Sequence, residues 1–141
     1  MLTQKDLDVA TLGECRFVSP LRLSVEPGDG MPDYTPEGAR VPLNMVQVPG
    51  RDAGEALCFE KAGPRARVFF DPKKVYAAIV TCGGLCPGLN NVIQSVFLEL
   101  YHNYGVSKVL GVRYGLSGFD PGSGLEPVDM TPAFVDGIQE L

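Results

Sequence analysis

The stretch Val75–Gly88, with the sequence VYAAIVTCGGLCPG, decides the fold of this chain. Residues 77–80 (AAIV) form a short apolar run rich in β-formers, which predicts a buried parallel strand. Gly83 and Gly84 follow where the chain must turn sharply, and Pro87 suits the first position of a helix. A strand, a glycine turn and a helix in this order direct free backbone N–H groups and the positive helix end toward one point. The stretch therefore predicts a binding site for an anion, most simply a phosphate.

The residues after this turn predict the rest of a βαβ unit. Apolar side chains at helical spacing predict an amphipathic helix, which Gly105 is placed to end. The apolar face consists of Leu89, Val92, Ile93, Val96 and Leu100. Residues 106–112 (VSKVLGV) predict a second, parallel strand reached by a right-handed crossover, and Thr131–Pro132 predicts the start of another helix. We expect an α/β fold that begins a doubly wound, Rossmann-like parallel sheet and is truncated, because two strands do not complete such a sheet.

The preceding residues, 1–74, have a different composition. Many of the 12 prolines and 17 glycines of the sequence crowd this half, so long regular elements are not expected. We expect one short extended piece within residues 11–23 and a strand at 66–70 (ARVFF), the latter as an edge strand that precedes the central one. The chain is thus divided into an irregular Pro/Gly-rich extension with short strands, 1–74, and the first part of an α/β domain, 75–141.

Composition and charge argue against several functional classes. The net charge is −5 and no basic run occurs, which argues against binding to nucleic acid or to a membrane surface. No apolar run approaches the roughly 20 residues of a membrane helix. The amino terminus lacks the apolar core of a secretory signal, so a cytoplasmic protein is expected.

The cysteines and the histidine do not form a metal-binding pattern. Three residues separate Cys82 from Cys86, not the two of a zinc knuckle, and His102 is the only histidine. We expect no metal site, packing roles for the thiols, and a solvated helix position for His102.

Two known nucleotide-binding motifs are incomplete here. Gly83 and Gly88 have Walker-loop spacing, but Leu89 and Asn90 replace the lysine and the hydroxyl residue of that motif. The dinucleotide fingerprint also fails, although Arg113 at the end of the second strand could accept a 2′-phosphate. The residues alone leave open a phosphate site, an NADP-type redox domain, and a non-catalytic binding or assembly module.

The stretch 77–93, AAIVTCGGLCPGLNNVI, closely resembles the first strand, loop and helix of the phosphofructokinases. The GGLCPGLN form is similar to the branch found in plants, trypanosomatids and some bacteria. Other segments resemble further parts of that family in the right order. These are 12–21 (LGECRFVSPL), 59–72 (FEKAGPRARVFFDP), 110–119 (LGVRYGLSGF) and 131–141 (TPAFVDGIQEL).

The resemblance implies phosphoryl transfer from ATP, or pyrophosphate, to the C1 hydroxyl of fructose 6-phosphate with Mg²⁺, a step of glycolysis. It places Gly84 against the donor phosphates and gives Gly83 and the backbone of Leu85 and Cys86 to the same loop. It also places Leu116 beside the nucleotide, where many relatives carry tyrosine or another aromatic residue. The full enzyme is expected to be a homo-oligomer.

The resemblance assigns no catalytic residue to this chain. The family's G-G-D-G-[ST] and T-I-D-N-D segments, the latter carrying the base for the sugar hydroxyl, do not occur in the sequence. Relatives under effector control carry arginine where Gln94 stands, which argues against that anionic effector site. We therefore expect the 141 residues alone to be inactive, as the amino-terminal portion of a phosphofructokinase.

Overall fold

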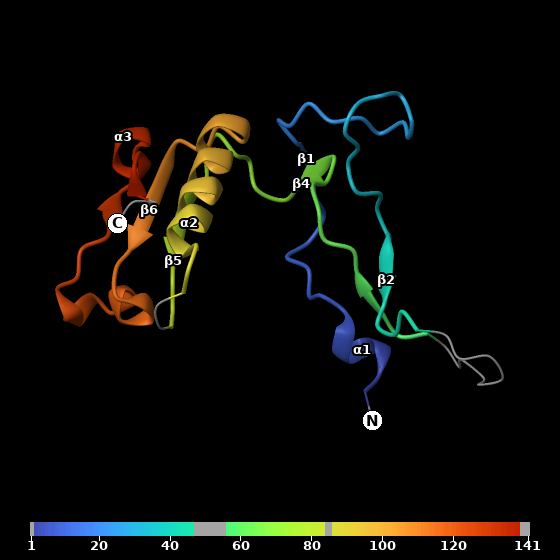
Figure 1. Cartoon of the computed structure of the whole chain (residues 1–141), viewed down its shortest axis with the longest axis horizontal. Helices are drawn as coiled ribbons and strands as arrows, with labels where there is room; N and C mark the ends of the chain where they lie inside the picture. Colours follow the sequence, from blue (N-terminus) through green and yellow to red (C-terminus); the bar gives the residue numbers. More distant parts are fainter. Residues whose placement is uncertain (1, 47–55, 84–85, 139–141) are drawn as a thin grey trace. The chain divides into compact units, whose positions relative to one another are not determined.

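The computed structural model describes residues 2–46, 56–83 and 86–138 (Figure 1). The chain divides into two compact units, unit 1 being Met1–Phe69 and unit 2 Phe70–Leu141. No helix among the described residues is long and apolar enough to cross a membrane.

Unit 1 consists of short elements. They are α1 (Gln4–Leu7), β1 (Phe17–Val18), β2 (Arg40–Pro42), β3 (Cys58–Glu60) and β4 (Arg67–Val68). Two antiparallel pairs form, β1 with β4 and β2 with β3. The predicted strand at 66–70 is confirmed in part, because Arg67–Val68 forms β4, which precedes β5 and pairs with β1. Val68 lies opposite Phe17, and Ser19 N donates to Ala66 O at 2.9 Å, so this segment pairs within unit 1.

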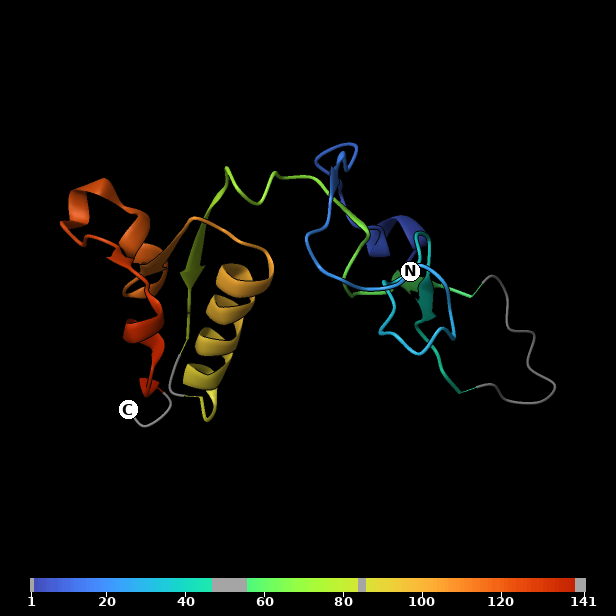
Figure 2. The same cartoon turned by 90° about the horizontal axis from the view of Figure 1, so that it is seen from above.

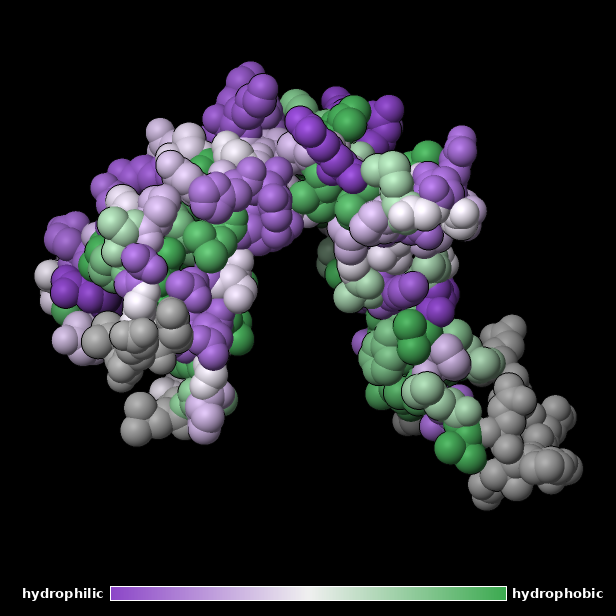
Figure 3. Space-filling view, turned by 45° about the horizontal axis from the view of Figure 1, so that its top comes forward, coloured by the Kyte–Doolittle hydropathy of each residue, from purple (hydrophilic) through white to green (hydrophobic). Residues whose placement is uncertain are grey.

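Polar contacts hold unit 1 together. Among its described residues, only Ser19 and Thr35 are buried. The guanidinium of Arg65 donates to the carbonyl oxygens of Thr35, Pro36 and Lys61, and it pairs with Glu60 at 2.9 Å. Apolar side chains remain at the surface, as with Val18 and Met45, and Figure 3 shows hydrophobic residues scattered among hydrophilic ones. The lack of long elements agrees with the proline-rich composition.

Unit 2 contains the predicted strand–helix–strand unit. Its elements are β5 (Tyr76–Val80), α2 (Leu89–Leu98), the π-helical turn η1 (Glu99–Asn103), β6 (Lys108–Val112), the 3-10 turns η2 (Gly115–Phe119) and η3 (Pro121–Ser123), β7 (Val128–Asp129) and α3 (Pro132–Val135). β5 and β6 are parallel, with Tyr76 opposite Lys108, as the sequence predicted. β7 adds an unpredicted antiparallel strand to β6, with Leu110 opposite Asp129. The fold is therefore mixed α/β with a mixed three-stranded sheet.

The core of unit 2 lies between α2, the sheet and α3. Its buried residues are Phe97, Val106, Val109, Met130 and Val135. Ala77 and Ile79 of β5 pack against this cluster, and both views show α2 running alongside β5 (Figures 1 and 2). Apolar positions on a helix and a strand thus meet, which is what removes their surface from water.

The buried face of α2 differs in part from the predicted face. Ile93 and Leu100 pack on the core as expected, but Val92 and Val96 are 58% and 42% exposed. Phe97 occupies the centre instead and is fully buried. The cause is a pair of amide side chains that face α3 and the residues just after it. Asn90 Nδ2 donates to Ile138 O and Gln94 Nε2 donates to Val135 O, each at 2.9 Å.

The prediction that Pro87 takes the first helical position is wrong, because α2 begins at Leu89 with Gly88 as its N-cap, and Pro87 lies in the turn before it. The predicted end at Gly105 and the predicted cap at Thr131 are confirmed. Gly105 follows the π-helical turn with φ of 67°, a left-handed conformation that glycine adopts without strain. Thr131 caps α3, because its hydroxyl oxygen accepts a hydrogen bond from the N–H of Phe134 at 3.2 Å.

Candidate functional site

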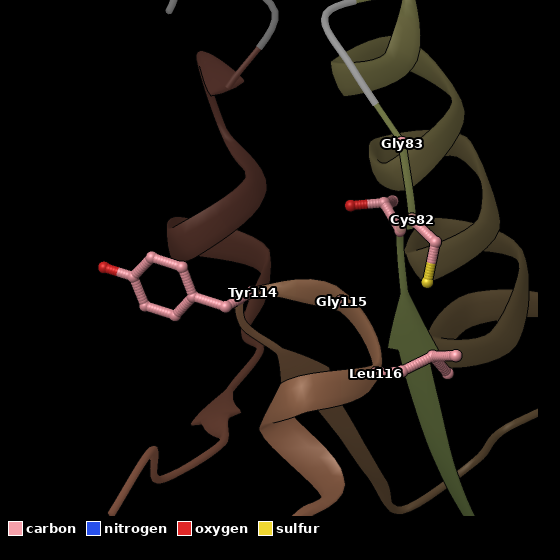
Figure 4. A pocket seen from close by; sticks show the side chains of 6 residues that line it. Cys82, Gly83, Tyr114, Gly115 and Leu116 are labelled. Atoms are coloured by element: carbon pink, nitrogen blue, oxygen red, sulfur yellow. The ribbon is translucent and has the colours of Figure 1, made fainter. Parts of the chain in front are cut away.

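A pocket of about 490 Å³ opens at the carboxyl ends of β5 and β6 (Figure 4). Its lining residues are Thr81, Cys82, Gly83, Tyr114, Gly115 and Leu116. Because β5 and β6 are parallel, the segments that follow them meet at one edge of the sheet. Open α/β sheets bind ligands at this edge. The structure thus brings Gly83 and Leu116, which are far apart in the sequence, into one pocket.

The described part of the glycine turn leaves its backbone open to a ligand. Gly83 has φ of 124°, which favours glycine, and apart from its chain neighbours no described atom lies within 4 Å of the position that a Cβ would take. Among the described residues, no side chain caps the amino terminus of α2, where Gly88 is the N-cap with φ of 82°. The N–H of Leu89 already donates to Cys86 O at 3.2 Å, so the amides of the next two residues, Asn90 and Asn91, are the ones that could meet an anion there.

Three further residues, Gly84, Leu85 and Cys86, were predicted to belong to the site. Gly84 and Leu85 lie outside the described residues. Cys86 is described and exposed, with its thiol 3.7 Å from Pro87 O, and it does not line the pocket. The predicted packing role for the thiols of the turn is wrong, because both Cys82 and Cys86 are exposed. The cause is their position beyond the end of β5, where the described residues do not cover them.

Glycine allows the segment after β6 to pack closely. A Cβ on Gly115 would lie 3.3 Å from Thr81 O, and one on Gly118 would lie 2.3 Å from Arg113 O. The second contact is shorter than real Cβ atoms allow. Tyr114, which precedes Gly115, has φ of 60° and is the only non-glycine residue with positive φ in the described ranges. Sequence reasoning did not select Tyr114, since nothing in the residue pattern signals this conformation.

Arg113 and His102 do not contribute to the pocket. The guanidinium of Arg113 donates to Glu126 O at 3.2 Å, and Arg113 is not a lining residue. His102 is exposed, with its ring edge-on to Tyr101, so the prediction of a solvated helix position is confirmed. Within 2–46, 56–83 and 86–138, no group of three or more His, Cys, Asp or Glu side chains is placed to hold a metal ion.

Fold and pocket together define an α/β protein whose candidate ligand site lies at the carboxyl edge of parallel strands. No family model matches the sequence. The chain is 42% identical over 140 residues to the ATP-dependent 6-phosphofructokinase of Amycolatopsis methanolica, covering 96% of this chain and 30% of that protein. It is 36% identical over 137 residues to the protein of the same name from Borreliella burgdorferi, covering 96% and 30%. It is 45% identical over 86 residues to ATP-dependent 6-phosphofructokinase 1 of Arabidopsis thaliana, covering 61% and 18%.

Over almost all of its length, this chain is homologous to the ATP-dependent 6-phosphofructokinases. The resemblance predicted from its glycine turn and flanking segments is therefore confirmed. The chain spans about 30% of the length of the first two relatives.

Proposed function

We propose that this chain forms the donor-side part of an ATP-dependent 6-phosphofructokinase, which transfers a phosphoryl group from ATP to the C1 hydroxyl of fructose 6-phosphate. One observation carries the proposal. The pocket joins the glycine turn after β5 to the loop after β6, in a chain homologous to these enzymes over 96% of its length.

In this proposal the glycine turn receives the donor phosphates. The open space around Gly83 allows a phosphate to approach the backbone, which a side chain would prevent. By resemblance, Gly84 and the backbone of Leu85 and Cys86 extend the same contact surface, and Leu116 lies beside the nucleotide. The extension 1–74, the donor domain 75–141, its continuation as a doubly wound sheet, the cytoplasmic location and the homo-oligomeric state belong to the same proposal.

The chain supplies positioning rather than acid–base chemistry. Phosphoryl transfer depends on placing both substrates and stabilising charge. No carboxylate lines the pocket among the described residues, and the sequence has neither G-G-D-G-[ST] nor T-I-D-N-D. Mg²⁺ accompanies ATP in this chemistry, and the described residues contain no group of three or more His, Cys, Asp or Glu side chains that could hold it. We therefore propose that the 141 residues alone do not turn over substrate.

A coupled assay for fructose 1,6-bisphosphate tests the proposal. The full polypeptide that contains this sequence should be active with ATP, and the purified 141 residues should not. Pyrophosphate is assayed in parallel as the alternative donor. Inactivity of the full polypeptide with ATP, or substantial turnover by the 141 residues, would overturn the proposal.

A variant of the turn adds a test of the site. Gly83→Val should raise the KM for ATP. The valine side chain would occupy the approach to the backbone, and the positive φ at position 83 disfavours a branched residue. Gly124→Val is the matched control, since Gly124 also has positive φ and open surroundings but does not line the pocket. Equal KM values for the two variants would argue against a phosphate contact at the turn.

A titration with NADPH and ATP addresses the redox alternative. No observation favours that alternative, because Arg113, the candidate partner of a 2′-phosphate, is bonded to Glu126 O outside the pocket lining. We expect ATP to bind more tightly than NADPH.

A further inference from the structure

Tyr114 adopts a backbone conformation that its side chain disfavours. Its φ and ψ are 60° and 36°, in the left-handed region, where an L residue brings Cβ close to a carbonyl oxygen. A bulky residue held there is unusual, and such residues gather at ligand sites when the surroundings over-determine them. Glycine would meet the same backbone geometry without strain. The turn geometry therefore does not explain why position 114 carries a tyrosine and not a glycine.

The surrounding loop fixes this conformation. Gly115, the next residue, also has positive φ, 59°, and lies against Thr81 O. Gly118 closes the turn against Arg113 O so tightly that a Cβ would not fit. On the other side of Tyr114, Arg113 is tied to Glu126 O. The backbone on both sides of Tyr114 is therefore held by packing and by a hydrogen bond.

The conformation directs the aromatic ring outward at the rim of the pocket. Tyr114 is 73% exposed and lines the pocket together with Gly83. Figure 4 shows its ring projecting away from Cys82 and Gly83. No hydrogen bond or ring contact within the described residues engages this side chain. Both faces of the ring are thus available to a planar ligand.

The pocket has two chemically different sides. The turn at Gly83 offers open backbone to an anion, and the rim at Tyr114 offers an aromatic face. Leu116, also at the pocket and 72% exposed, can give apolar contact but has no π-system for stacking. A nucleotide carries phosphates at one end and a planar base at the other, whereas pyrophosphate has no group for the aromatic side.

We propose that Tyr114 stacks on the adenine base of the donor, and that it favours a nucleotide over an inorganic polyphosphate in this pocket. The inference rests on the proposed function, of which it specifies the donor class. Tyr114 is a binding residue in this proposal and takes no part in the transfer of the phosphoryl group.

Three proteins test the proposal, all as the full polypeptide that contains this chain: the wild type, Tyr114→Gly and Tyr114→Phe. The glycine variant removes the ring and relieves the backbone strain of the positive φ, so it should remain folded. Thermal unfolding checks this. The phenylalanine variant keeps the ring and removes the hydroxyl. The probes are ATP and inorganic tripolyphosphate, which shares the phosphates but lacks the base.

For Tyr114→Gly we expect ATP binding, measured by calorimetry, to weaken about tenfold or more. Tripolyphosphate binding should change less than about twofold, since the turn at Gly83 is untouched. Tyr114→Phe should resemble the wild type with both probes. ATP binding by Tyr114→Gly within about twofold of the wild type would overturn the proposal. Equal weakening toward both probes would also overturn it, because that result indicates a collapsed loop rather than a lost stack.

The assay of turnover separates this proposal from the proposed function. If the wild type phosphorylates fructose 6-phosphate with ATP while Tyr114→Gly binds ATP as tightly as the wild type, the stacking proposal is wrong and the proposed function stands. If the wild type shows no ATP-dependent turnover, the proposed function is wrong. The calorimetric comparison of ATP with tripolyphosphate then still tests the stacking proposal.

Discussion

Gly118 occupies a position where a single methyl group has no room. Its φ is ordinary, but a Cβ would lie 2.3 Å from Arg113 O and 2.7 Å from Val112 Cγ1. The backbone oxygen cannot move aside without shifting the loop that carries Tyr114. Gly118→Ala should therefore lower the free energy of unfolding by at least about 1 kcal/mol, as measured by urea denaturation.

Gly122→Ala is the matched control in the same segment. Its φ is also ordinary, and the nearest atom to an added Cβ is the side-chain oxygen Oδ1 of Asp120 at 3.3 Å. This oxygen accepts a hydrogen bond from Gly122 N at 2.9 Å, and a small shift of the side chain can accommodate the methyl group. We expect a change within about 1 kcal/mol, because alanine also restricts the unfolded chain. Equal effects of the two substitutions would contradict the tight packing at Gly118.

Asp6 provides a pH-dependent contact at the start of α1. The hydroxyl of Thr3 donates to Asp6 Oδ2 at 2.7 Å and the N–H of Thr3 donates at 2.8 Å. The hydroxyl and then the backbone N–H lower the pKa of Asp6 below its ordinary value of 3.8. Because the folded-state pKa is depressed, the contact stabilises α1 fully above the unfolded pKa and is lost as the pH falls through the folded pKa.

Thr3→Ala should raise the pKa of Asp6 toward 3.8, as followed by an NMR titration of its carboxyl group. Asp29 is the internal control, since its pKa is lowered by the hydroxyl of Ser24 and then by the N–H of Met31. Ser24→Ala should shift Asp29 alone. Movement of both carboxyl groups in either variant would show that the two contacts are not local.

At the scale of elements, Gln94 joins α2 to α3. Its Nε2 donates to Val135 O at 2.9 Å beside the buried side chain of Val135. Gln94→Glu keeps the shape but loses the donor and places a carboxylate against a carbonyl oxygen. We expect a loss of about 1–3 kcal/mol in the free energy of unfolding. Faster hydrogen exchange of the Asp136 N–H, which bonds to Pro132 O, should accompany it.

Ser95→Ala is the control on α2, because Ser95 is exposed and its hydroxyl makes no hydrogen bond within the described ranges. It should change stability by less than about 0.5 kcal/mol. If Gln94→Glu were as mild as this control, the contact between the helices would not stabilise unit 2.

The elements predicted from the sequence are those with local signals. β5 follows an apolar run, Gly105 takes a left-handed φ, and Thr131 caps its own helix. The buried face of α2 depends on a contact between Gln94 and Val135, which is far along the chain. The spacing of apolar residues within α2 cannot reveal such a contact. β7 has only two residues, Val128–Asp129, and so no alternation to detect.

The candidate site was predictable where topology alone decides it. Gly83 and Leu116 meet because parallel strands end at the same edge. Their place beside the donor comes from the family resemblance and stays a prediction. Tyr114 was missed, because its place depends on a strained φ imposed by the packing of Gly115 and Gly118. Propensity assigns tyrosine no such conformation, so only the three-dimensional loop reveals it.

At the scale of the whole molecule, apolar burial is unequal between the two units. Every buried hydrophobic residue in the described ranges belongs to unit 2, whereas the buried residues of unit 1 are Ser19 and Thr35. Apolar burial is the dominant favourable term in folding, so unit 1 should open at a lower free energy than unit 2. Hydrogen exchange of the 141-residue chain should show weak protection at Ser19 N and strong protection at Met130 N, although both are hydrogen-bonded.

Val109→Ala tests whether the two units open independently. Val109 is 3% exposed in the core of unit 2, and its truncation should cost about 2 kcal/mol there. Protection of Met130 N should fall accordingly, while that of Ser19 N should not change, because a cost in one cooperative unit does not alter local opening in another. If the substitution lowers protection equally at Ser19 N and Met130 N, or the wild type shows one common opening free energy, the two units open as one cooperative unit and the prediction is wrong.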